Sequence, residues 1–275
     1  MTRFSWYPPR LAGSVLGILL VQACPAMGKE ELRICADPNN LPFSNDKREG
    51  YENKIAAVMA KDLGYRLSYF WLKQRQGFFR QTLGAHRCDL VMGVPSGFER
   101  VLTTQPYYRS GYVIVTPTHR ALSFTSYDDP RLKELKIGIH ITGKDGSNSP
   151  PAHALGKHHL EKNMVGYSMW GEASKKNPQG KVVDAVSQGA IDLAIVWGPF
   201  GGYFAKPYGK SLTVELAPSD PLLADMPFAY DISMGVRKED TALADKLNNS
   251  LQRRQGEITR ILGEYRVPLI PLPAH

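Results

Sequence analysis

The sequence predicts an α/β protein of two lobes, because one strand–turn–helix pattern occurs twice in the chain. In the first copy, the apolar run 89–94 (DLVMGV) ends at the turn 95–97 (PSG), which is typical of a parallel strand buried on both faces. In the second copy, the run 192–197 (DLAIVW) ends at a Gly-Pro turn and leads into a segment rich in aromatic residues. Residues that follow such strands commonly line a crevice. We therefore expect two lobes that face each other across a cleft.

The first lobe is expected to begin with a strand and a loop rich in turn-forming residues. Proline, asparagine and serine residues surround Leu41 and Phe43, so the loop presents two apolar side chains. A helix follows, starting at Glu52 or Asn53 and ending at Gly64, a residue that suits a helix C-terminus. The elements predicted for this lobe are strand 32–37, helix 54–63, strand 66–72, helix 78–83, strand 89–94 and strand 111–116.

The second lobe is expected to lie between two crossings of the chain. Residues 117–120 should enter it and residues 227–237 should leave it, and a last amphipathic helix over 240–265 then packs on the first lobe. The elements predicted for the second lobe are strand 136–140, a helix that starts at Pro150, helix 181–188 and strand 192–197. The expected division is residues 29–117 together with 229–275 for the first lobe, and residues 118–228 for the second.

Residues 1–28 are predicted to form a secretory signal peptide. Two arginines precede the apolar segment 11–21, which is shorter than a membrane-spanning helix. Cleavage is expected after Ala26 or Gly28. The alternative is cleavage before Cys24, which would leave that residue lipidated. We expect a periplasmic protein whose mature chain has no transmembrane span.

The charge balance is basic but does not indicate a nucleic-acid-binding protein. The formal charge is +8, and removal of residues 1–28, which hold two arginines and no acidic residue, leaves +6. The basic residues are scattered, with no basic helix or nucleic-acid module. An acidic protein partner is compatible with this balance.

Seven segments, in order along the chain, carry a resemblance to a known family: 32–45 (LRICADPNNLPFSN), 50–56 (GYENKIA), 89–98 (DLVMGVPSGF), 102–113 (LTTQPYYRSGYV), 146–155 (GSNSPPAHAL), 192–205 (DLAIVWGPFGGYFA) and 231–237 (DISMGVR). The chain resembles periplasmic solute-binding proteins of the two-lobed class that serves polar amino acids. It is most similar to their MxaJ/XoxJ-like branch, which is encoded beside methanol dehydrogenases that depend on pyrroloquinoline quinone (PQQ). The resemblance implies the type II periplasmic binding protein fold, with a mostly parallel sheet flanked by helices in each lobe and two hinge crossings.

Cys35 and Cys88 are expected to form a disulfide. Each cysteine lies beside one of two strands that should be neighbours, and an exported protein folds in an oxidising compartment. The alternative is two separate buried thiols that act as small apolar side chains.

The resemblance also indicates what the cleft lacks. In amino-acid-binding relatives, an arginine after the central strand pairs with the ligand's carboxylate. Arg100 lies about one residue too far along for this role, and Glu99 could simply neutralise it. The relatives' second anchor, an aspartate that accepts the ligand's ammonium, is replaced by the turn Trp197-Gly198-Pro199. A free amino acid is therefore a poor candidate ligand, because a buried ammonium without an acceptor is costly.

The cleft is instead expected to be aromatic, and to suit a flat or amphipathic ligand or a protein segment. Two alternatives remain open: Phe43 could cap the core of its own lobe, and Arg109 could form a salt bridge at the hinge. The helix start at Pro150 could hold an anion or face solvent. The residues predicted for the cleft are Phe43, Tyr51, Ser96, Arg100, Tyr107, Tyr108, Arg109, Thr142, Ser147, Trp197 and Phe200.

The function implied by the resemblance is that of a periplasmic accessory protein for a PQQ-dependent methanol or alcohol dehydrogenase, its expected protein partner, in activation, maturation or cofactor handling. The alternative is the solute-binding component of an ABC transporter for a small polar or aromatic ligand other than a free amino acid. We expect no enzyme, because the sequence has no HExxH, GxSxG or paired-carboxylate motif. No cofactor or metal site is predicted, since the spacing of His153, His158 and His159 does not place two rings on one helix face.

Overall fold

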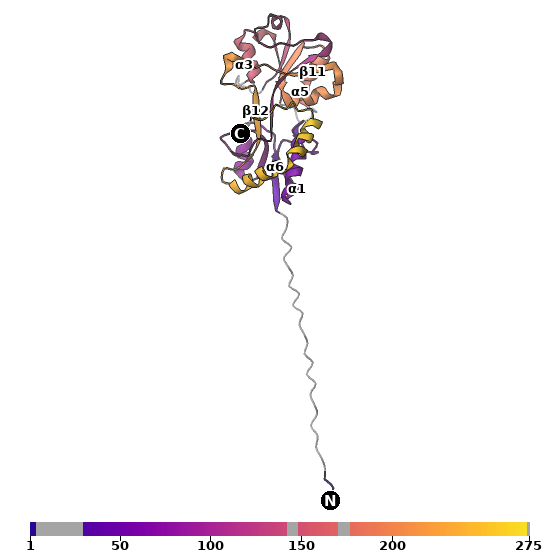
Figure 1. The fold of residues 1–275 in the computed structure, drawn as a ribbon, viewed down its shortest axis with the longest axis vertical. Coiled ribbons are helices and arrows are strands. Elements are labelled where there is room, and N and C mark those ends of the chain that lie inside the picture. Colours follow the sequence, from indigo (N-terminus) through magenta and orange to yellow (C-terminus); the bar gives the residue numbers. More distant parts are fainter. Residues whose placement is uncertain (4–29, 142–147, 170–176, 274–275) are drawn as a thin grey trace.

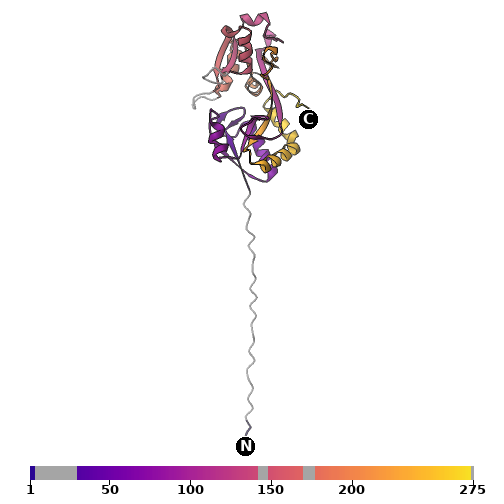
Figure 2. The ribbon, with the colours of Figure 1, turned by 90° about the vertical axis from the view of Figure 1, so that its left-hand side faces the viewer.

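The computed structural model describes residues 1–3, 30–141, 148–169 and 177–273. It has two lobes, which Figure 2 shows one above the other and joined by extended strands. Lobe 1 contains the early elements and the last helix, and lobe 2 contains the middle of the chain (Figure 1). This arrangement confirms the predicted two-lobed α/β fold. Two of the predicted cleft residues, Thr142 and Ser147, lie outside the described residues. So does the predicted signal peptide with Cys24, except for residues 1–3.

The lobe 1 sheet has a parallel part with the order β4-β1-β5, and β12 extends it in the antiparallel sense. Its strands are β1 (Glu31–Ala36), β4 (Arg66–Trp71), β5 (Leu90–Pro95), β6 (Leu102–Thr103) and β12 (Ala229–Val236), with the small hairpin β2 (Asn39–Asn40) and β3 (Ser44–Asn45) beside it. Its helices are α1 (Tyr51–Leu63), α2 (Phe78–Gln81) and α6 (Thr241–Glu264). The helices α1 and α6 contact each other, and their apolar faces share one core with the sheet.

The lobe 2 sheet is parallel from β10 through β8 to β9, and β7 and β11 add antiparallel strands. Its strands are β8 (Ile137–Ile141), β9 (Met164–Ser168), β10 (Leu193–Trp197) and β11 (Leu212–Leu216). Its helices are α3 (Pro150–Lys157), α4 (Lys181–Ser187) and α5 (Gly198–Ala205). Two separate cores form against this sheet.

Two long strands connect the lobes. The start of β7 (Tyr108–Pro117) pairs with the start of β12, and from Tyr112 onward β7 pairs with β10 and β11 of lobe 2. The chain therefore passes from one lobe to the other inside β7. The division after residue 117 that the sequence predicts falls at the end of this strand and stays a prediction.

The segment after α6 packs over this crossing. Ile270 forms a β-bridge with Arg109, and the Ser110 hydroxyl donates a hydrogen bond to the Pro268 carbonyl at 2.6 Å. On the lobe 2 side, Tyr203 of α5 stacks on Tyr265 with 5.7 Å between ring centroids. The C-terminal segment of lobe 1 thus contacts the crossing strand β7 and lobe 2.

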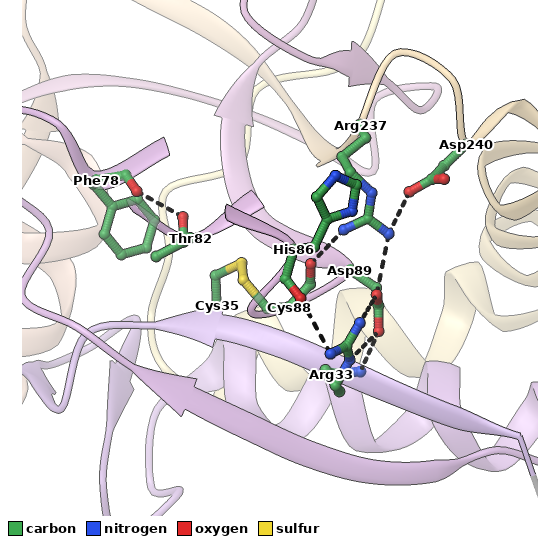
Figure 3. Close-up of a disulfide and its surroundings, with 9 residues drawn as sticks. All are labelled: Arg33, Cys35, Phe78, Thr82, His86, Cys88, Asp89, Arg237 and Asp240. Carbon is green, nitrogen blue, oxygen red and sulfur yellow. Dashed lines mark hydrogen bonds and ion pairs between the residues drawn. A yellow bond between two sulfur atoms is a disulfide. The ribbon is translucent and has the colours of Figure 1, made fainter. Parts of the chain in front are cut away.

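The predicted disulfide is present and joins β1 to the residue before β5 (Figure 3). The Cα atoms of Cys35 and Cys88 are 5.4 Å apart. Beside it, Asp89 accepts hydrogen bonds from Arg33 at 2.7 Å and from Arg237 at 3.1 Å. Partial burial opposes ionisation of Asp89, but these hydrogen bonds outweigh it and lower its pKa. A group of ion pairs centred on Asp89 thus lies next to the disulfide.

Within the described ranges, none of the helices has the length and apolar character needed to cross a bilayer.

Candidate functional site

A cavity of about 350 Å³ lies between the lobes. Lobe 1 contributes the loop before α1, the start of α1 and the middle of β5, whereas lobe 2 contributes the ends of β8 and β10 and the starts of α3 and α5. The residues that line it are Asn40, Phe43, Glu52, Gln74, Gly93, Tyr112, His140, Ser149, Met169, Ile195, Val196, Trp197 and Phe200. The cavity therefore occupies the cleft that the sequence predicts.

Aromatic rings from both lobes form much of its wall. Phe43 of lobe 1 meets Phe200 of lobe 2 edge to face, with 5.0 Å between ring centroids. Trp197, at the end of β10, packs against Tyr112 of the crossing strand at 5.5 Å. Phe43 also contacts Tyr51, so it serves both its own lobe and the cavity. Such pairs favour an edge-to-face arrangement and hold the rings in place.

Glu52 brings a carboxyl group into this aromatic cavity. The backbone N–H groups of Tyr51 and Glu52 donate to the carbonyls of Pro42 and Phe43, which fixes the start of α1 against the preceding loop. The side chain then reaches over β5 at Gly93, where an added Cβ would overlap the carboxylate. Burial raises the pKa of Glu52 to about 8, so the carboxyl is mostly neutral at pH 7.

His140 lies on the other side of the cavity, near the end of β8. Only 4% of its surface is exposed, and its Nε2 lies 2.9 Å from the Gln179 carbonyl oxygen. This contact makes Nε2 the protonated nitrogen of a neutral ring. Burial lowers the pKa of His140 to about 4, because its effect is larger than the opposite effect of the hydrogen bond to Gln179. The ring is therefore neutral at pH 7.

Gln179 bridges the two lobes directly. Its side-chain amide donates to the Asn39 carbonyl at 3.2 Å and to the Asn40 side chain at 3.3 Å. Together with the Phe43–Phe200 contact, this bridge closes one side of the cavity in the conformation described.

The structure divides the predicted cleft residues into three groups. Phe43, Trp197 and Phe200 line the cavity. Tyr51, Tyr107 and Tyr108 do not: they belong to the lobe 1 core, where the hydroxyls of Tyr51 and Tyr108 are 2.8 Å apart. The aromatic character of a residue does not reveal on which face of a sheet or helix it lies, and these three pack into the core of their own lobe.

The polar predictions lie on the surface or at the hinge. Ser96 is exposed in the turn after β5, where its hydroxyl is 2.6 Å from that of Ser233. Arg100 is also exposed and does not line the cavity. Arg109 forms an ion pair with Asp231 at 2.8 Å, between the two crossing strands. This is the salt bridge at the hinge that was the alternative role for Arg109.

Glu52, His140 and Tyr112 were not predicted for the cleft. The glycine in the middle of the buried strand β5 was the available signal for Glu52, because an interior strand glycine often marks a close approach by another group. The prediction that the turn 197–199 offers no acceptor for an ammonium did not take account of Glu52, whose carboxyl lines the same cavity. The poor fit of a free amino acid stays a prediction. The cavity also has no arginine to pair with a ligand's carboxylate, because no described lining residue is Lys or Arg.

Metal coordination finds no support in the described ranges, which contain no cluster of three or more His, Cys, Asp or Glu side chains placed to hold an ion. The side chain of His158, one of the three histidines whose spacing argued against a metal site, lies between the carboxylates of Asp128 at 2.8 Å and Asp220 at 3.1 Å.

Comparison with known proteins gives consistent matches over both lobes. Residues 32–267 match the model of the bacterial extracellular solute-binding proteins, family 3. Protein MoxJ of Methylorubrum extorquens is 32% identical over 250 residues, 88% of this chain and 82% of that protein. Protein MoxJ of Paracoccus denitrificans is 30% identical over 268 residues, 92% of this chain and 94% of that protein. The crystal structure of the periplasmic binding protein XoxJ from Methylobacterium extorquens AM1 aligns with a TM-score of 0.71 and 35% identity, over 88% of this chain and all of that one.

Proposed function

Because the chain belongs to the bacterial extracellular solute-binding proteins, family 3, and within them to the MoxJ and XoxJ relatives, we propose that it is a periplasmic accessory protein of a PQQ-dependent methanol or alcohol dehydrogenase. The observation that carries the proposal is the extent of the similarity, which spans both lobes and nearly the full length of these relatives. In this role it would assist activation, maturation or cofactor handling of the dehydrogenase. Export to the periplasm would use the predicted signal peptide.

The composition of the cavity supports this role over that of an amino-acid transport receptor. A receptor of that type holds the ligand's carboxylate with a guanidinium group. Here Arg100 lies on the surface, and the described lining has no cationic side chain to replace it. The family and the relatives likewise favour a binding role over a catalytic one.

The rim of the cleft is the surface that we assign to the dehydrogenase. Trp197 is partly exposed there and packs against Tyr230 of the second crossing strand, with 5.9 Å between ring centroids. Partly buried aromatic residues of this kind commonly dominate protein interfaces. The basic excess of the chain should add attraction to an acidic partner, which weakens as salt rises.

The test is a binding and activity assay with the purified dehydrogenase of the same organism. We expect association at low salt that weakens at high salt, and a loss of about tenfold or more in affinity for Trp197→Ala, because interface tryptophans often contribute 2 kcal/mol or more. Leu222→Ala is the matched control, since Leu222 is an exposed apolar residue outside the cavity. Thermal unfolding of both variants shows whether they remain folded. No association at low salt, with normal dehydrogenase activity in a strain that lacks this protein, would overturn the proposal.

A further inference from the structure

The carboxyl group of Glu52 has no hydrogen bond or ion pair with any residue of the described chain, although it lies inside the interlobe cavity. Its backbone is held firmly, because the N–H of Glu52 donates to the Phe43 carbonyl at 3.0 Å. Glu52 is half-buried, and an acidic group in an apolar cavity without a partner costs free energy when it ionises, which a bound cation would offset.

The position of this carboxyl is built into lobe 1. The Glu52 carboxylate lies over Gly93 of β5, where an added Cβ would overlap its Oε1 atom. Gly93 lies in a buried strand, where glycine is otherwise unfavourable. The glycine at position 93 therefore leaves the room that the Glu52 side chain needs.

The groups that face this carboxyl are aromatic or neutral. Phe43, Tyr112, Trp197 and Phe200 line the same cavity, and aromatic faces attract cations through their quadrupole. The amides of Asn40 and Gln74 and the hydroxyl of Ser149 line it too, and the Ser149 hydroxyl has no partner among the described residues. These neutral groups can hydrogen-bond a ligand hydroxyl.

An anionic ligand group finds little here. The described lining contains no lysine or arginine, and His140 is neutral because burial lowers its pKa to about 4. The N-terminus of α3 at Ser149 opens onto the cavity, but its first two helical residues, Pro150 and Pro151, have no backbone N–H to donate. A carboxylate would therefore lose its hydration without gaining equivalent donors.

We propose that the interlobe cavity binds a small organic cation, an alkylammonium ion that carries at most a hydroxyl as its second polar group. Its charge would lie between the Glu52 carboxylate and the aromatic rings of Phe43, Trp197 and Phe200. The volume of about 350 Å³ is at the small end of ligand sites, and suits a molecule of roughly ten heavy atoms or fewer. Trp197 belongs both to this cavity and to the rim assigned to the dehydrogenase, whereas Glu52 belongs to the cavity alone, so a change at Glu52 tests the cation site without removing the rim residue.

Binding of such a cation should tighten as pH rises. Burial raises the pKa of Glu52 to about 8. The titratable groups near it are His140 across the cavity and the tyrosines of α1, β4 and β7. All are neutral at pH 7, because burial raises the tyrosine pKa values and lowers that of His140; the tyrosines are Tyr51, Tyr69, Tyr107, Tyr108 and Tyr112. The ionised fraction of Glu52 therefore sets the affinity, which should rise roughly twentyfold from pH 6.5 to pH 8.5.

The experiment is titration calorimetry at pH 8.5 with three probes of nearly equal shape. Choline carries a trimethylammonium group and a hydroxyl, 3,3-dimethylbutan-1-ol is its uncharged analogue, and glycine betaine has a carboxylate in place of the hydroxyl. We expect choline to bind at least tenfold more tightly than either of the others. Equal binding of the uncharged alcohol would overturn the role of charge, and equal binding of betaine would overturn the exclusion of anionic groups. Absence of choline binding would overturn the proposal altogether.

Glu52→Gln is the critical variant, because it keeps the shape of the side chain and removes its charge. We expect it to lose at least tenfold in choline affinity and to lose the pH dependence. Glu99→Gln is the matched control, since Glu99 is exposed and outside the cavity, and its choline affinity should be unchanged. Undiminished choline binding by Glu52→Gln would overturn the assignment. Dehydrogenase association by Glu52→Gln tests the other proposal separately, because we expect it to remain.

Discussion

Among individual residues, Glu52 and His140 are two ionisable groups in one cavity, and burial favours the uncharged form of each. The pKa of Glu52 rises from 4.5 to about 8, whereas that of His140 falls from 6.5 to about 4. Stability linked to Glu52 is fully present below pH 4.5 and is lost as pH rises through about 8. Stability linked to His140 is present above pH 6.5 and is lost as pH falls through about 4.

Glu52→Gln should therefore change how stability depends on pH. The wild-type protein must ionise a buried carboxyl as pH rises, and the variant has none to ionise. We expect the variant to match the wild type near pH 4.5 and to be more stable by ~1–3 kcal/mol at pH 9, with the effect of His140 cancelling between the two. Urea unfolding across this pH range measures the difference. Glu99→Gln serves as the exposed control, and a constant offset between Glu52→Gln and wild type at all pH values would contradict the raised pKa.

Among secondary-structure elements, the strand pair β1 and β5 has the firmest connection. The disulfide closes a loop of sequence separation 53 between Cys35 and Cys88, and the chain-entropy model gives such a loop about 4 kcal/mol of stabilisation. Replacement of both cysteines by serine should lower the free energy of unfolding by about that amount. Urea unfolding under non-reducing conditions checks it. Reduced wild-type protein should resemble the double variant, and equal midpoints for the oxidised wild type and the double variant would exclude a stabilising role.

The elements that could be predicted from sequence are those with a strong apolar pattern. The buried strands β1, β5 and β10 and the helices α1 and α6 follow runs or faces of apolar residues, and the structure has them close to the predicted limits. The strands β9 and β11 were not predicted. Their residues are mostly half-buried or exposed, so the neighbouring strand decides their conformation more than their own sequence does.

The cavity could be predicted only in part, for a related reason. Trp197 and Phe200 lie at and just after the end of a buried parallel strand, where side chains commonly reach a crevice, and both line the cavity. Glu52 lies one position after a core tyrosine, at the start of a helix. Whether it faces solvent or the opposite lobe depends on how the two lobes are arranged, and no local pattern encodes that.

At the scale of the whole molecule, contacts between α5 and the segment after α6 hold the lobes in their relative position. Gly202 of α5 lies directly against the Arg266 carbonyl oxygen, and an added Cβ would overlap it. Lys206, just beyond α5, donates to the Glu264 carbonyl at 2.9 Å. The lobes therefore depend on close backbone approach at this point.

Gly202→Ala should destabilise the protein by about 1–3 kcal/mol, because overpacking of a backbone contact forces the two segments apart. The change should also alter the angle between the lobes, which small-angle X-ray scattering would detect. Gly256→Ala is the matched control: it lies in α6 with nothing near its added Cβ, and should be neutral or stabilising by about 0.5–1 kcal/mol. Similar effects of the two substitutions would show that the close contact at Gly202 does not matter.

The place of β12 in the sheet has a consequence for how the protein is made. It is the last strand that the structure describes, yet it lies between β5 and β7, which are complete more than a hundred residues earlier. A nascent chain that has not yet reached residue 229 therefore leaves the edges of both strands without a neighbour, and unpaired edges invite pairing between molecules. Premature termination before β12 should give an aggregating fragment rather than a smaller folded protein, so the edges of β5 and β7 must be kept from pairing with other molecules until residues 229–236 have been synthesised.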